Sequence, residues 1–158
     1  MSALFLPHPE CPTRPAGVAP LAVASMPLGH LRRAEERQFA TMDGAFARHG
    51  GMVRADEAAW LLRRHAGRPI SALARWIVER RVVSFTWQER LLVPLFQFTP
   101  CEMRLRAGVT EAARALATRF DDWAIALWFA QPNELLDERA PVDVIEIDPA
   151  AVTMAARN

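Results

Sequence analysis

The stretch that decides the fold is residues 122–143, which read DWAIALWFAQPNELLDERAPVD. A pair of aspartates precedes an apolar run that Pro132 ends, which predicts a short helix with Asp121 or Asp122 as its cap. Asn133 can hydrogen-bond its own backbone and so fix the turn that follows. The stretch therefore predicts a capped helix that leads directly into a defined turn.

The residues after the turn divide into buried and exposed positions. We expect Leu136 to hold the turn against a core, whereas Asp137 and Glu138 are expected to face water. Pro141 and Pro149 each stand where a helix can begin, because proline is favoured at the first helical position. Two short helices are therefore predicted at the end of the chain.

Upstream, the sequence VPLFQF at residues 93–98 predicts the returning strand of an antiparallel hairpin. The outgoing strand is expected to begin at Val82, in a run of β-branched and aromatic residues. Pro94 favours an edge strand or a bulge, because proline has no amide hydrogen to donate. This part of the chain therefore predicts one small antiparallel element in a helical protein.

Helical spacing of apolar residues predicts three helices before the hairpin and two after it. Gly50-Gly51 is expected to end the first helix, and Ser71 to cap the third. The predicted helices cover residues 28–49, 56–65, 72–81, 109–119 and 121–130. Four residues of the third helical region are expected to face inward: Ile70, Leu73, Ala74 and Ile77.

The overall prediction is an α+β fold that is mostly helical. A helix-turn-helix plus a β-hairpin, in the order of a small winged helix, precedes a C-terminal helical module. Residues 1–27 hold six of the twelve prolines and only two charged side chains, which predicts a disordered arm. Residues 28–98 are then the helical and hairpin region that could bind DNA, and residues 99–158 the partner-binding module.

Charge is distributed unevenly between these regions. Residues 48–81 carry eight arginines against three acids, a net charge of +5. Residues 110–158 carry four arginines against nine acids, a net charge of −5. The basic stretch would attract DNA phosphates, although a solvated surface of the same charge is an open alternative. The predicted DNA contacts are Arg75, Trp76, Arg80 and Arg81.

The residues that catalysis needs do not occur in the right patterns. The four histidines lack metal-ligand spacing, and no serine lies in a nucleophile elbow. The chain has no lysine, which excludes a Schiff-base lysine and a Walker-A phosphate loop. Cys11 and Cys101 are expected to be free thiols in a reducing cytoplasm. We therefore expect a cytoplasmic protein that is not an enzyme, with no metal, no cofactor and no membrane span.

Two motifs resemble those of Xre/ParS-type antitoxins, the partners of RES-type toxins, which attack NAD. Residues 94–98, PLFQF, resemble that family's P-x-F/W-Q-F strand. Residues 122–143 resemble its toxin-binding segment in the spacing of tryptophan, Pro-Asn, leucine and proline. The family often has glycines where this chain has Asp137 and Glu138. The resemblance implies an antitoxin that binds and occludes a toxin and regulates its own operator.

The partner contacts expected on this basis are Trp128, Phe129, Pro132, Asn133, Asp137 and Glu138. The expected mechanism is steric occlusion, with acidic groups placed beside a toxin pocket built for an anionic dinucleotide. A stand-alone winged-helix-like transcriptional regulator without a toxin partner is the alternative. Association into a homo-oligomer is left open.

Overall fold

The computed structural model describes residues 28–158 and confirms a mixed α+β fold that is predominantly helical. The predicted arm over residues 1–27, and Cys11 within it, lie outside the described residues. The elements are α1 (Leu28–Ala47), β1 (Met52–Arg54), α2 (Ala55–Leu62), α3 (Pro69–Val78), β2 (Phe85–Trp87), β3 (Arg90–Pro94), the 3-10 helix η1 (Leu95–Gln97), α4 (Ala107–Leu116), α5 (Asp122–Ala130), the 3-10 helix η2 (Glu134–Leu136), α6 (Pro141–Val144) and α7 (Pro149–Arg157).

The sheet has three antiparallel strands in the order β1-β3-β2. The predicted hairpin is confirmed, with β2 pairing β3, but β1 adds a third strand on the other side of β3. The sequence favoured an edge strand or a bulge at Pro94. This prediction is wrong, because Pro94 is the last residue of the central strand β3. The strand tolerates proline because this residue is its last, after which residues 95–97 form η1 in place of the predicted strand.

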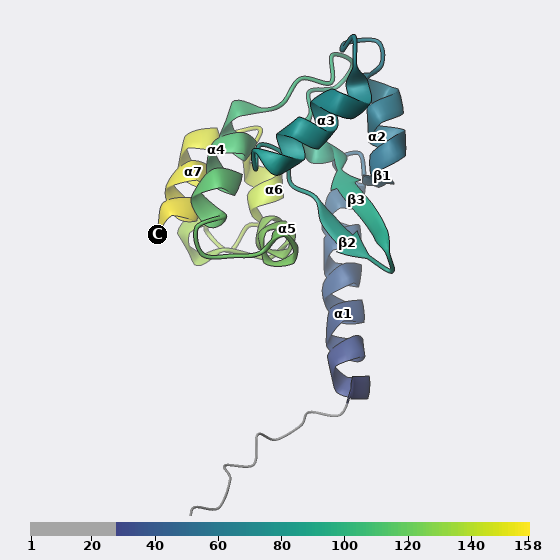
Figure 1. Ribbon diagram of the computed structural model, residues 1–158. Helices are drawn as coiled ribbons and strands as arrows, with labels where there is room; N and C mark the ends of the chain where they lie inside the picture. Colours follow the sequence, from purple (N-terminus) through teal and green to yellow (C-terminus); the bar gives the residue numbers. More distant parts are fainter. Residues whose placement is uncertain (1–27) are drawn as a thin grey trace, which may run out of the picture.

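Two hydrophobic cores lie on either side of this sheet. The larger core joins α1 to α4, α5, α6 and α7, and it includes the fully buried Met42 and Phe46. The smaller core joins α2 and α3 to residues of the sheet and its flanks, including Leu62 and Leu73. Figure 1 shows α2 and α3 on one side of the hairpin, and the C-terminal helices on the other. The helix α1 therefore shares a core with the C-terminal module and does not group with α2 and α3 as the predicted boundary at residue 98 implied.

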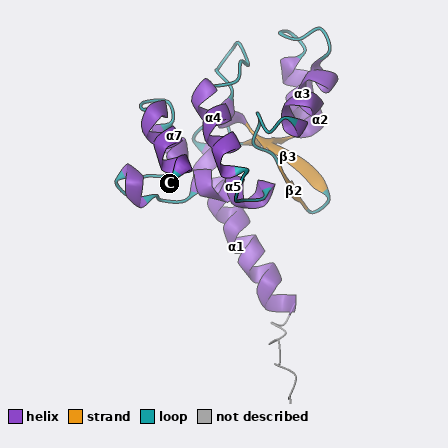
Figure 2. Cartoon of the chain, turned by 60° about the vertical axis from the view of Figure 1, so that its left-hand side comes forward, coloured by secondary structure: helices purple, strands orange, loops and turns teal. Residues whose placement is uncertain are grey.

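The two cores meet along a seam at which neighbouring residues point into different cores. Val82 packs in the smaller core and Val83 in the larger one, and Phe98 and Phe96 divide in the same way. Gln97 lies between them, fully buried. Figure 2 shows the strands passing between the two groups of helices.

The Gln97 side chain links the two backbone segments of the seam. Its Oε1 accepts a hydrogen bond from Val83 N at 2.7 Å. Its Nε2 donates to Val83 O and to Pro94 O, each at 2.8 Å. Because a buried polar group is costly unless it is bonded, these three bonds explain why the core tolerates a glutamine.

The third predicted helix differs from the observed α3 in both its start and its buried side. The helix begins at Pro69, the favoured position for proline, and Ser71 is not its cap. Leu73 is buried as predicted, but Ile70 is 74% exposed and Ala74 is also at the surface. The cause is tertiary, because among the described elements α3 packs mainly on α2, which covers only one side of it.

The C-terminal module follows the sequence signals more closely. Asp121 caps α5, with its Oδ1 accepting from Ala124 N at 2.8 Å, and Pro141 and Pro149 begin α6 and α7 as predicted. The helices α4 and α7 pack together. A Cβ atom on Gly108 would lie 2.6 Å from Pro149 Cβ, so their close approach requires glycine at this position.

Candidate functional site

The turn between α5 and α6 is built around Asn133. Asn133 Oδ1 accepts a hydrogen bond from Leu135 N at 2.9 Å. Asn133 O accepts from Leu136 N at 2.9 Å and from Glu138 N at 3.1 Å, while Asn133 N donates to Arg139 O at 3.1 Å. One residue therefore organises the whole turn, in agreement with the prediction that an asparagine would fix it.

Two adjacent residues of this turn adopt the left-handed conformation. Asp137 has a φ of 56° and Glu138 a φ of 58°, and both side chains are exposed. Residues other than glycine rarely take this conformation, which costs about 1–2 kcal/mol per residue. Leu136, which is only 5% exposed, packs in the larger core and anchors the turn. The turn is therefore strained at its tip and held firmly at its base.

The predicted partner residues do not all lie on one surface. Pro132, Asp137 and Glu138 are exposed, and Asn133 is half-buried. Phe129 is fully buried in the larger core, which corrects its assignment as a direct partner contact. Its aromatic ring is enclosed because α5 is apolar on nearly every side and is surrounded by the core.

Trp128 is half-buried, and its ring packs edge-on against Phe129 with 5.1 Å between the ring centroids. It lies against the larger core, so only part of its surface is open to a partner. Trp123, five residues earlier in α5, also packs against the larger core, so both tryptophans of this helix take part in packing.

Leu135, which is not among the predicted partner residues, is 61% exposed at the tip of the turn. The turn contains two adjacent leucines, and a tight turn held by Leu136 can bury only one of them. The element η2 packs against α7, where Met154 is also exposed. An exposed apolar side chain therefore stands directly beside the two exposed acids.

The four predicted DNA contacts have different surroundings. Arg75 is exposed, whereas Trp76 is half-buried against the smaller core. Arg80 forms an ion pair with Asp122 at the start of α5. Arg81 lies 3.5 Å from the Glu79 carboxylate. Two of the three arginines are therefore already paired with acids within the chain.

Other arginines near α2 and α3 are more open to solvent. Arg63, Arg64 and Arg68 are exposed, and none of them takes part in an ion pair with a described residue. The Arg63 guanidinium lies 3.5 Å from the centroid of the Trp60 ring, stacked on it. The basic surface near the helix pair is therefore centred on the end of α2 and the α2–α3 turn.

An apolar groove of about 570 Å³ lies between α2 and α3, with Trp60, Ile70 and Leu91 among its lining residues. Val78, at the end of α3, is 82% exposed. Homo-oligomer formation, which the sequence leaves open, stays a prediction.

Within residues 28–158, no three histidine, cysteine, aspartate or glutamate side chains come together as a metal site. No helix in the same range has the length and hydrophobicity needed to cross a membrane. Comparisons with protein-family models, curated proteins and solved structures find no match for this chain.

Proposed function

We propose that this chain is an antitoxin-like protein that binds and occludes a toxin of the RES type. The observation that carries the proposal is the turn at residues 131–139. Its base is anchored in the larger core by Leu136, while its tip presents Leu135, Asp137 and Glu138 to solvent. A rigid surface of this kind loses little conformational entropy on binding, which favours its use as a contact.

The chemistry of the tip suits the proposed target. A toxin that attacks NAD needs a pocket with positive potential for the dinucleotide phosphates. Two exposed carboxylates beside such a pocket would be electrostatically complementary, and Leu135 would bury apolar surface on contact.

The test is co-expression with a RES-type toxin, with growth and co-purification as readouts. We expect the wild-type chain to restore growth and to co-purify with the toxin. The variant Leu135→Asp should lose both properties. The variant Val78→Asp is the matched control, because it places the same charge on an exposed aliphatic position outside the turn. Equal rescue by both variants would exclude the turn as the contact.

The electrostatic part is tested separately with Asp137→Asn combined with Glu138→Gln. Asparagine tolerates the left-handed conformation, so this pair removes charge without adding strain at Asp137. The association rate with the toxin should fall, mainly at low salt. The control pair Asp43→Asn with Glu111→Gln removes two exposed charges elsewhere and should leave the rate unchanged.

A second candidate function is a transcriptional regulator that binds DNA, with or without a toxin partner. The observation that favours it is connectivity: α2, a turn and α3 lie between β1 and β2, and β1 pairs with β3. This is the order expected of a winged helix, and the exposed arginines near α2 and α3 would supply phosphate contacts.

The DNA proposal is tested by binding to the chain's own promoter at several salt concentrations. Replacing Arg68 and Arg75 with alanine should weaken binding and flatten the salt dependence. Arg80→Ala should have a smaller effect, because Arg80 is paired with Asp122. Absence of binding at low salt would remove this candidate, whereas DNA binding without a toxin gene nearby would favour the stand-alone regulator.

A further inference from the structure

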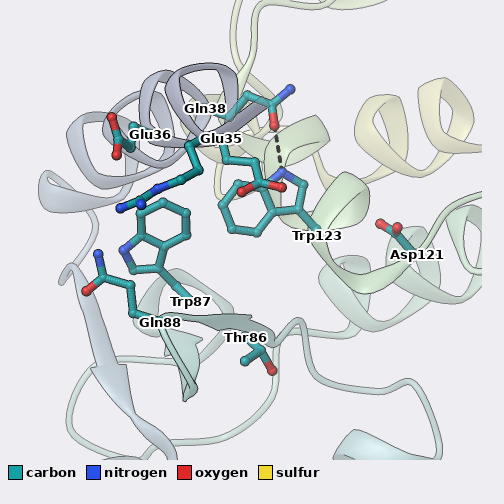
Figure 3. Close-up of a pocket in the computed structure, with 9 residues that line it drawn as sticks. Glu35, Glu36, Gln38, Thr86, Trp87, Gln88, Asp121 and Trp123 are labelled. Atoms are coloured by element: carbon teal, nitrogen blue, oxygen red, sulfur yellow. Dashed lines mark hydrogen bonds between the residues drawn. The ribbon is translucent and has the colours of Figure 1, made fainter. Parts of the chain in front are cut away.

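A cleft of about 560 Å³ lies between α1, the hairpin and the start of α5. Figure 3 shows Trp87 and Trp123 beside each other in this cleft, with glutamates of α1 above them. The cleft is at the N-terminal end of α5, whereas the turn proposed to bind a toxin follows its C-terminal end. The nine residues of α5 separate the two by about 13 Å along the helix axis.

The two indole rings of the cleft are held in place by neighbouring side chains. Trp87 stacks on Phe39 with 4.6 Å between centroids and an angle of 8° between the planes. Trp123 Nε1 donates to Gln38 Oε1 at 2.8 Å, the bond drawn in Figure 3. The rings lie 5.5 Å apart and are tilted by 32°. The aromatic wall is therefore formed before any ligand arrives.

The charge around the wall is predominantly negative. Glu35, Glu36 and Asp121 line the cleft, against one arginine, Arg32. None of these four residues forms an ion pair with another described residue. An organic cation is attracted both to the face of an indole ring and to nearby carboxylates. The combination favours such a cation over an anion or an apolar ligand.

We propose that this cleft binds the guanidinium group of an arginine side chain from a protein partner. A guanidinium is planar, so it can stack on an indole while its edge donates two hydrogen bonds to one carboxylate. The chain already shows half of this arrangement elsewhere, where the Arg63 guanidinium stacks on Trp60. The proposal does not depend on the antitoxin function, because it concerns a different end of α5.

The test is a titration with N-acetyl-arginine N-methylamide, followed by NMR of the tryptophan indole N–H groups. The chain has five tryptophans, so each gives its own signal. We expect the signals of Trp87 and Trp123 to shift and saturate, while those of Trp76 and Trp128 stay in place. The matched citrulline compound, which has the same shape without the charge, should produce no saturable shift. Saturable binding of citrulline, or equal shifts of all five signals, would overturn the proposal.

Charge variants provide the second arm. Glu35→Gln with Glu36→Gln should weaken binding about fivefold, because the guanidinium loses its carboxylate acceptor and a second nearby negative charge. The control pair Asp43→Asn with Glu111→Gln should bind as the wild type does. Arg32→Ala should strengthen binding about twofold, since it removes a like charge from the rim. No change with the glutamate variants would contradict the carboxylate contribution and the proposal with it.

A third arm separates a guanidinium from other cations. Tetramethylammonium carries the same charge but cannot donate hydrogen bonds, so it should bind more weakly than the arginine compound. Tighter binding of tetramethylammonium would assign the cleft to alkylated ammonium groups and overturn the assignment to arginine.

Discussion

The two cores of this protein differ in how completely they enclose their apolar side chains. The larger core surrounds α5 so fully that Phe129, Ile125 and Ala126 are all buried. The smaller core buries only one side of α3 and leaves Ile70 and Val78 at the surface. The comparison teaches that an apolar side chain on a helix is buried only where neighbouring elements pack over that side of the helix.

The difference also bears on where each proposed function lies. The turn proposed to contact a toxin is attached to the larger core, which is suited to holding a strained conformation. The arginines proposed to contact DNA surround the smaller core, where fewer tertiary contacts hold the helices. We expect the two regions to differ in stability as well as in charge, and the following predictions test that difference from the largest effect to the smallest.

The largest effect is expected from breaking the seam between the two cores with Gln97→Leu. The change leaves Val83 N–H, Val83 C=O and Pro94 C=O without their side-chain partner, at about 1–3 kcal/mol for each buried group. Urea unfolding should show a loss of at least ~3 kcal/mol. Gln131→Leu is the control, because that glutamine is exposed. A loss below ~1 kcal/mol at Gln97 would mean that water or relaxation replaces the bonds.

The second prediction compares two adjacent leucines of the turn. Leu136→Ala should lower the free energy of unfolding by ~2–5 kcal/mol, because its side chain is buried in the larger core. Leu135→Ala should change it by less than ~0.5 kcal/mol, because that side chain is exposed. Thermal and urea unfolding measure both. Similar losses for the two variants would show that the turn is not anchored in the way described.

The third prediction concerns local opening. Amide hydrogen exchange should be faster in α3 than in α5, with opening free energies that differ by ~1–3 kcal/mol, because α3 has fewer packed neighbours. The comparison uses the amides of Leu73 and Ala126, each inside its helix. Equal protection of these two amides would show that both cores open as one cooperative unit.

The smallest effect is expected from relieving strain at the tip of the turn. Glu138→Gly should raise the free energy of unfolding by about 1 kcal/mol, since glycine adopts the left-handed conformation without steric cost. Asp137→Gly should gain less, because aspartate tolerates this conformation better than glutamate. Urea unfolding of both variants and the wild type shows which of the two substitutions gives the larger gain in stability. A loss of stability in both variants would show that the acidic side chains contribute more than the backbone strain costs.

The elements that the sequence predicted well depend on interactions within a few residues. Asp121 caps α5 three residues away, Asn133 bonds Leu135 two residues away, and Pro149 begins α7 at the position proline prefers. The Gly50-Gly51 turn after the first helix is also a local feature, because glycine takes the positive φ that both residues have. Local signals of this kind act in any tertiary context, so they can be read directly along the chain.

The features that the sequence did not predict depend on contacts between distant residues. Arg80 is paired with Asp122, 42 positions away, and this removes it from the free basic surface. The inward direction assigned to Ile70 was wrong because α2 covers only one side of α3. Trp87 and Trp123 line one cleft only because α1 brings Phe39 and Gln38 to hold them. Helical periodicity shows which residues share a face, but only the packed neighbours decide which face is buried.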